Sequence, residues 1–274
     1  AILCRPRACS APALGLSERR RQPRLSADKQ ERYQQQSLNA MFDKRQLGRL
    51  TPFTPRNLFL RQKAKRHKQM AIATIDTESL FSLRRGAHKR SLSIMDLKYF
   101  DIDYWIEESL FRAMDHELDR KRNIRLLDIG TGFGYFPYLC NYLGNHGYAI
   151  DRSGHQLYDE VCEVLGIDRV TYTIQPQTPL QTLFDQKFDL VTAYQIGFDL
   201  VPGVGFWSPE DWDFFLREAR DKWLAPGGKL FLALNYKHRY NDWYTPGVRE
   251  VLRSHGARMR LGQVVIQVPA DDKK

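Results

Sequence analysis

Strand-like and helix-like patterns alternate from residue 124 to residue 268, and this alternation limits the possible folds more than any other feature. Short apolar runs with the length of buried strands lie at 124–129, 147–150, 170–174, 188–193, 230–234 and 264–268. Residues 133–143, 156–165, 209–223 and 248–254 have helical spacing, and an amphipathic helix over 103–121 precedes them. Such alternation builds a largely parallel sheet with helices on both faces. We therefore predict a doubly wound α/β fold.

The first predicted strand leads into a glycine-rich loop, Gly130 to Gly134, at the start of a helix. Glycines there let the backbone turn sharply and approach a ligand closely. A dinucleotide site has the pattern G-x-G-x-x-G, but Tyr135 stands where the third glycine is needed. Asp128, two residues before the first glycine, would repel a diphosphate and attract a cationic amino acid. The loop therefore favours S-adenosylmethionine over NAD.

Two further features lie at the ends of predicted elements. The second predicted strand ends at Asp151, where a carboxylate accepts hydrogen bonds from ribose hydroxyls. A Pro-Gly-Gly run at 226–228 lies between a predicted helix and a predicted strand, and its chemistry is that of a helix stop and tight turn.

Together these motifs resemble the class I S-adenosylmethionine-dependent methyltransferases over about 125–268. The matching runs are Leu127-Asp128-Ile129-Gly130-Thr131-Gly132-Phe133-Gly134, Asp151, Phe188-Asp189-Leu190-Val191 and residues 224–229. The runs Phe188-Asp189-Leu190-Val191-Thr192-Ala193 and Trp212-Asp213-Phe214-Phe215-Leu216 are similar to bacterial methyltransferase-domain proteins of unassigned substrate. The resemblance implies a Rossmann-like methyltransferase fold, a doubly wound, mostly parallel seven-stranded sheet. It says nothing about residues 1–95.

The resemblance also implies a set of residues that bind S-adenosylmethionine. Asp128 would lie near the methionine amino group, Asp151 would hold the ribose, and Gln175 is the nearest candidate for the adenine amino group. One departure concerns the end of the chain, where 258–268 leaves little room for the usual antiparallel pair of strands unless Gly262-Gln263 is a very tight turn. The full predicted cofactor set is Asp128, Gly130, Thr131, Gly132, Gly134, Asp151, Gln175 and Tyr194.

The methyl acceptor is less determined than the cofactor. The loop at 194–199, after the fourth strand, lacks the Pro-bearing tetrapeptide of enzymes that methylate nucleobase amino groups, and it lacks a Pro-Cys nucleophile. We expect a small molecule or a glycan-type acceptor with a hydroxyl or carboxyl group. Methylation of RNA or protein and a non-catalytic role in an assembly remain alternatives. His238 is either a general base or part of a solvated loop, so no catalytic residue is assigned, and no metal site is expected.

Charge divides the chain into two parts. Residues 1–98 hold 22 Lys and Arg against 7 Asp and Glu, whereas the remainder holds 20 against 25. We predict a basic, partly disordered extension with short helices over 1–95 and a methyltransferase domain over 96–274. Ten Lys and Arg between Arg56 and Arg90 form either a solvated arm or a site for an anionic partner such as RNA.

The cellular setting follows from weaker signals. Residues 1–27 have six Arg and one acid, a composition that resembles a transit peptide, but we favour an artificial start, a translated upstream region or a disordered tail. Four cysteines without a CxxC pair argue against a disulfide scaffold, and no apolar run is long enough to cross a bilayer. We expect a cytoplasmic protein, with organellar import as the alternative.

Overall fold

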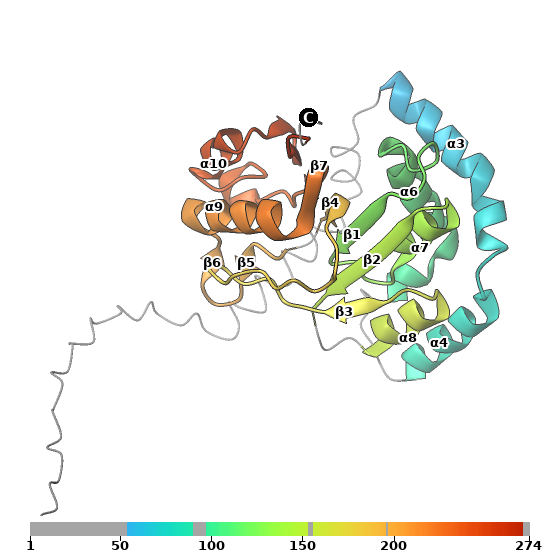
Figure 1. The fold of residues 1–274 in the computed structure, drawn as a ribbon. Helices are drawn as coiled ribbons and strands as arrows, with labels where there is room; N and C mark the ends of the chain where they lie inside the picture. The colour runs from blue at the N-terminus through green and yellow to red at the C-terminus, as the bar shows by residue number, and fades with distance from the viewer. Residues whose placement is uncertain (1–53, 90–96, 153–155, 196, 271–274) are drawn as a thin grey trace, which may run out of the picture.

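In the computed structural model, a seven-stranded sheet lies between two helical layers (Figure 1). The structure describes residues 54–89, 97–152, 156–195 and 197–270. The strand order is β3-β2-β1-β4-β7-β9-β8, and β9 alone points in the direction opposite to the other six strands. This confirms the predicted doubly wound, mostly parallel seven-stranded sheet. The strands are β1 (Arg125–Ile129), β2 (His146–Asp151), β3 (Arg169–Thr171), β4 (Phe188–Tyr194), β7 (Leu224–Ala233), β8 (Arg258–Arg260) and β9 (Gln263–Gln267).

Alternation of side chains along the strands explains the two layers. Leu127 and Ile129 of β1 join the core under α9 (Pro209–Glu218) and α10 (Val248–Ser254), whereas Leu126 faces the opposite side. That opposite side is covered by α6 (Ile102–Asp115), α7 (Tyr135–Tyr142) and α8 (Gln156–Val164). A separate short hairpin of β5 (Leu200–Val201) and β6 (Gly205–Phe206) follows β4. Short helices η1 (Lys98–Phe100), η2 (Ala219–Trp223, a π-helix) and η3 (His238–Tyr240) complete the fold.

The basic segment before the sheet is a pair of packed helices where the structure describes it. Helices α3 (Pro55–Ile72) and α4 (Thr77–Lys89) form an outer layer against α6 and α8 (Figure 1). Leu60 and Leu80 are buried in the same apolar cluster as Ile106 and Leu110 of α6. This part of the predicted extension therefore shares a core with the sheet. Residues 1–53, including the transit-like run, lie outside the described residues.

Most basic side chains of α3 are paired with acids on or just after α6. Lys68 bridges Asp103 and Glu107, the latter at 2.9 Å, and Arg61 lies 3.1 Å from Glu108. The two carboxylates raise the pKa of Lys68. Two more pairs join Arg56 to Asp115 and Lys63 to Asp119. Four of the six Lys and Arg of α3 are therefore held against the protein itself.

The predicted helix over 103–121 is too long, because α6 ends at Asp115. Glu117 adopts a left-handed φ of 62°, and the amide of Leu118 donates to the carbonyl of Ala113 at 2.9 Å. This is a Schellman-type stop with a residue other than glycine at its left-handed position, so the sequence carries no obvious end signal. Burial of Leu118 accompanies it.

One expectation near the end of the chain needs correction, and the tight turn on which another depended is present. Strand β7 begins at Leu224, earlier than predicted, and the Pro-Gly-Gly run forms an irregular step in its pairing with β4. A Cβ on Gly228 would lie 2.8 Å from the carbonyl oxygen of Phe188, so glycine permits this close approach. The antiparallel hairpin does fit, because β8 has only three residues and turns into β9 through Leu261 and Gly262.

Candidate functional site

Two acids of the predicted set lie on neighbouring parallel strands near their carboxyl ends. Asp128 belongs to β1 and Asp151 closes β2, which pair in register. The Asp128 side chain is buried and accepts a 2.7 Å hydrogen bond from the hydroxyl of Thr192 on β4. Because ligands of such sheets bind beyond the carboxyl ends of the strands, these residues mark the candidate site.

Burial dominates the electrostatics of Asp128. Desolvation raises the pKa of its carboxyl group to about 6, although the Thr192 hydrogen bond and the positive charge of Arg112 both act to lower it. A carboxylate held in this way is stabilised when a cation arrives. The residue therefore suits a ligand that brings a positive group to the end of β1.

Asp151 shapes the glycine-rich loop from the neighbouring strand. One carboxylate oxygen accepts a 2.9 Å hydrogen bond from the amide of Gly132, and the other accepts from the amide of Arg152 at 2.8 Å. The buried side chain of Arg169 lies 4.0 Å away. An ionised carboxylate has lone pairs beyond those used here, so Asp151 retains capacity for hydroxyl donors.

Glycine is needed at different positions of this loop for different physical reasons. Gly132 has a φ of 60°, and a Cβ built there would have the Tyr99 ring, at 4.0 Å, as its nearest neighbour, so space lies open above it. Gly134 has a φ of 77°, but a Cβ there would press on the sulfur of Cys162 at 3.0 Å. Gly134 therefore lets α7 pack against α8, whereas Gly132 faces open space. Gly130, with a φ of 70°, and the half-buried Thr131 complete the loop.

An aromatic cluster from before the sheet packs beside the loop. Tyr99 of η1 lies 5.3 Å from the Phe133 ring and 6.0 Å from the Tyr158 ring, centroid to centroid. The hydroxyl of Tyr135 donates to the carbonyl of Tyr99 at 3.0 Å. Tyr135, which replaces the third dinucleotide glycine, thus anchors η1 to the loop. The sequence pattern of the sheet gives no signal for Tyr99, since it lies outside that pattern.

Tyr194, the predicted residue after β4, takes part in a buried polar cluster on the α6 side of the sheet. Its hydroxyl is 2.7 Å from Nε2 of His116, and Nδ1 of His116 is 3.2 Å from the ammonium of Lys229. Lys229 can only donate, so Nδ1 accepts and the Nε2 proton is donated to Tyr194. Burial, and then the charge of Lys229, hold the pKa of His116 well below its ordinary value.

The remaining candidates, Gln175 and His238, follow β3 and β7. Gln175 is exposed in the loop beyond β3, and in the part of the chain described here it makes no hydrogen bond to the site residues. His238 is exposed on η3 and its ring lies 5.1 Å from that of Tyr236. Asp199 and Lys237 form a buried ion pair of 3.0 Å that joins the loop after β4 to the loop after β7.

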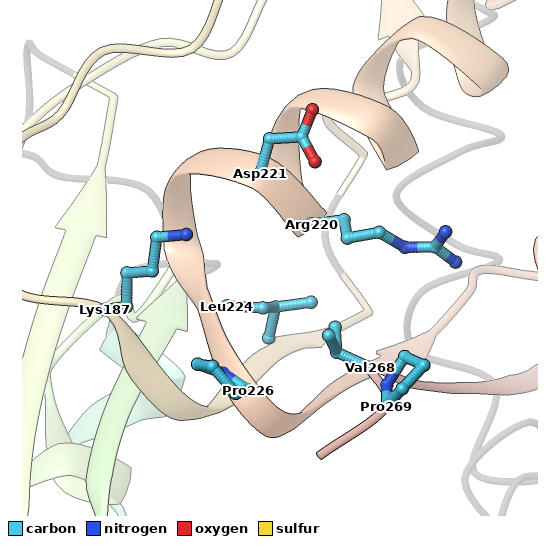
Figure 2. A pocket seen from close by; sticks show the side chains of 7 residues that line it. All are labelled: Lys187, Arg220, Asp221, Leu224, Pro226, Val268 and Pro269. Atoms are coloured by element: carbon cyan, nitrogen blue, oxygen red, sulfur yellow. The ribbon is translucent and has the colours of Figure 1, made fainter. Parts of the chain in front are cut away.

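A cavity of about 430 Å³ lies at the amino ends of β4 and β7, away from the candidate site (Figure 2). Figure 2 shows Leu224 and Val268 between Lys187 and Arg220. Within residues 54–270, apart from the gaps given above, no group of His, Cys, Asp and Glu has the arrangement of a metal site. The helices described include none long and apolar enough to cross a membrane.

Comparison with known proteins supports only a distant similarity. Neither a family profile nor a curated protein sequence matches the chain. Among solved structures, it is similar to a TehB-like SAM-dependent methyltransferase from Corynebacterium glutamicum, at 13% identity and a TM-score of 0.39 over 70% of this chain and 97% of that one. Streptomyces venezuelae DesVI matches at 13% identity and a TM-score of 0.44, over 71% and 98%. The glycopeptide N-methyltransferase MtfA matches at 14% and 0.39, over 59% and 89%. Assignment of a function therefore rests on the residues of this chain.

Proposed function

We propose that the chain is an enzyme that transfers a methyl group from S-adenosylmethionine to a small-molecule or glycan-type acceptor. The observation that carries this proposal is the pair Asp128 and Asp151 at the carboxyl ends of β1 and β2, together with the hydrogen bond from the Gly132 amide to Asp151. When bound, the cofactor supplies an activated methyl group on a sulfonium, and the protein contributes alignment.

The residues present fit this cofactor. Asp128 is a buried carboxylate that lacks a contacting cation among the described residues, so it suits the methionine ammonium. Asp151 has acceptor capacity for ribose hydroxyls, and Gly132 leaves room beside the loop. Gln175 remains the proposed contact for the adenine amino group. Tyr194, at the end of β4, remains a proposed cofactor contact.

The acceptor side is formed by the loop after β4, the β5–β6 hairpin and η3. Leu200, Val204 and Tyr240 are exposed there, and the Phe206 and Tyr240 rings lie 6.2 Å apart. We propose a hydroxyl or carboxyl group as the acceptor, because the 194–199 loop lacks the residues that hold a nucleobase amine. Pairing of α3 cations with α6 acids disfavours RNA as the substrate.

Calorimetric titration with S-adenosylmethionine and with S-adenosylhomocysteine tests the cofactor assignment. We expect both ligands to bind the wild type. Asp151→Ala should lose most of that affinity, because it removes the carboxylate that accepts hydrogen bonds from the ribose hydroxyls and from the Gly132 amide. Asp185→Asn, an exposed change in another loop, serves as the control. Selective binding of NADH would contradict the assignment, and labelled methyl groups found in N6-methyladenosine after incubation with RNA would contradict the acceptor class.

A further inference from the structure

Helix α3 is amphipathic in the reverse of the usual sense. The four positions that it buries hold one leucine, two alanines and Lys68. Three large apolar side chains, Leu58, Phe59 and Met70, are instead exposed, by 44%, 57% and 62%. A surface helix normally buries such side chains and exposes its charges. Here ion pairs draw Arg61 and Lys68 toward α6, and the opposite side of the helix keeps apolar surface in water.

Two cations share that opposite side with the apolar side chains. Lys65 stands seven residues after Leu58, and Arg66 stands seven residues after Phe59, so each pair lies on one side of the helix, two turns apart. Met70 follows Arg66 by one turn. Neither cation has an ion pair among the residues that the structure describes, and α3 contains no Asp or Glu. These five residues, the outer face of α3, therefore combine apolar and positive groups without an acid.

A second copy of this chain does not fit the outer face of α3. Lys65 and Arg66 lie near the middle of the span from Leu58 to Met70. A two-fold axis through this face would therefore set the cations of one chain against those of its copy. Repulsion between these like charges opposes such a pairing.

A nucleic acid or a groove in another protein would use only part of the outer face. Phosphates would pair with the cations but would leave Leu58 and Met70 in water, and Phe59 provides a single ring for stacking on bases. A helix that docks in a protein groove has apolar side chains at each turn, spaced i, i+3, i+4 and i+7. Here glutamines and the two cations separate Phe59 from Met70.

We propose that the outer face of α3 binds the surface of an anionic lipid bilayer. A helix that lies in the plane of the interface places apolar side chains at the level of the acyl chains and its cations beside anionic headgroups. From Leu58 to Met70 the helix extends about 18 Å, at about 1.5 Å per residue, so both ends of the face can reach one surface. Figure 1 shows α3 outside α6, away from the sheet.

Binding of this kind holds the protein on a bilayer rather than across it. It is compatible with the finding that the described helices include none able to span a membrane. It goes beyond the proposed methyl transfer, because surface binding sets where the protein acts and does not depend on which cofactor it uses.

Sedimentation with lipid vesicles tests the assignment on the full chain. The vesicles consist of phosphatidylcholine alone or of phosphatidylcholine mixed with phosphatidylserine. An apolar variant combines Phe59→Gln with Met70→Gln, and a charge variant combines Lys65→Gln with Arg66→Gln. All four altered side chains are exposed, so the melting curves of the variants should coincide with that of the wild type.

Two exposed positions elsewhere provide matched controls. Leu261→Asn removes an apolar side chain, 42% exposed, in the turn between β8 and β9. Arg253→Gln removes a cation on α10 whose side chain is 60% exposed. Residues 1–53 are present in every protein, so differences in binding come from the altered positions.

We expect the wild type and both controls to bind the mixed vesicles and to bind phosphatidylcholine alone far more weakly. The charge variant should lose affinity for the mixed vesicles by about 25-fold, at about fivefold per cation near an anionic surface. The apolar variant should lose about 10-fold or more, because two side chains no longer enter the acyl region.

Three results would overturn the proposal. The first is a wild type that does not bind the mixed vesicles. The second is binding that the charge variant weakens and the apolar variant leaves unchanged, which would show a polyanion site of the kind that RNA uses. The third is a wild-type dimer in sedimentation velocity that dissociates in the apolar variant, which would show that a second copy covers the face. Calorimetry with S-adenosylmethionine is a separate measurement, and none of these results alters its outcome.

Discussion

At the scale of single residues, Asp128 shows how a binding group acts against stability. Its pKa of about 6 in the folded protein lies above the ordinary value of 3.8, so the folded state favours the protonated form. The free energy of unfolding is therefore reduced as the pH rises from about 4 through 6, by up to about 3 kcal/mol at neutral pH. A bound ammonium group would offset this loss.

Replacing Asp128 by Asn tests this reasoning. Asparagine is neutral and keeps an acceptor for Thr192, so Asp128→Asn should raise the free energy of unfolding at pH 7.5 by about 1–3 kcal/mol. The gain should disappear near pH 4, and cofactor affinity should fall at pH 7.5. Urea unfolding at both pH values and calorimetry measure these effects, with Asp185→Asn as the control. Destabilisation at neutral pH would show that the charge of Asp128 is already compensated.

The ion pair of Asp199 and Lys237 is a second residue-scale case, because side-chain exposures of 5% and 3% leave it almost without water. Lys237 also donates to the carbonyl of Trp243 at 3.0 Å. Lys237→Met should cost about 3–5 kcal/mol, since it leaves the Asp199 charge buried and unpaired. The double variant with Asp199→Asn should recover much of that loss. Arg217→Met, which removes an exposed pair with Asp213, should cost less than about 1 kcal/mol. Additive costs in urea unfolding would contradict this coupling.

At the scale of elements, α3 and α4 belong to the folded core. Leu60, Ile75 and Leu80 are each at most 8% exposed, and burying such side chains contributes about 1.5–3 kcal/mol apiece. Removing residues 1–95 should therefore cost at least about 5 kcal/mol, close to the whole stability of many domains. A chain lacking only residues 1–53 is the matched control and should unfold near the full-length melting temperature. Equal melting temperatures for the two truncations would show that α3 and α4 are dispensable.

Elements that carry a hydrophobic pattern within their own residues can be predicted from the sequence, whereas elements defined by contacts with other segments cannot. Buried strands such as β1 and β4 have continuous apolar runs, and Asp128 and Asp151 are tied to strand ends by the loop chemistry that follows. Strand β8 has only three residues, and the Arg at each end is exposed. Its strand conformation depends on pairing with β9, so its own sequence shows no strand pattern. The C-terminal end of α6 is not predicted from the sequence, because Glu117 occupies the left-handed position where glycine is usual.

The parts of the site that sequence spacing misses come from elements before the sheet. Arg112 and His116 are separated by one turn of α6, but nothing in that spacing indicates that they reach Tyr194 and Lys229. The burial of Leu60, Ala64 and Ala71 likewise forms a narrow stripe of mostly small residues, which is too weak a signal to predict that α3 packs on α6. Tertiary contacts decide these cases.

At the scale of the whole molecule, the excess of positive charge is partly neutralised by the fold. The segment before the sheet keeps four exposed basic side chains with no ion pair within the described ranges: Lys65, Arg66, Arg84 and Arg85. Among the eight Lys and Arg of residues 56–87, these four are available to a polyanion, whereas the other four are paired with acids. Residues 54–87 therefore offer a weaker electrostatic surface than their composition suggests.

A salt series on RNA retention measures how many of these charges bind. If all four contact phosphates of a single strand, log affinity should fall against log salt with a slope near −3, at about 0.7 per contact. We expect retention by the chain lacking residues 1–53 to be weak at physiological salt and to follow a slope no steeper than this. Changing Lys65 and Arg66 to Gln should roughly halve the slope without lowering the melting temperature. Changing the paired Arg61 and Lys68 to Gln should instead lower the melting temperature. Tight retention with a much steeper slope would mean that the α3–α6 ion pairs open to receive RNA, and the RNA-dependent alternative would then replace the small-molecule acceptor.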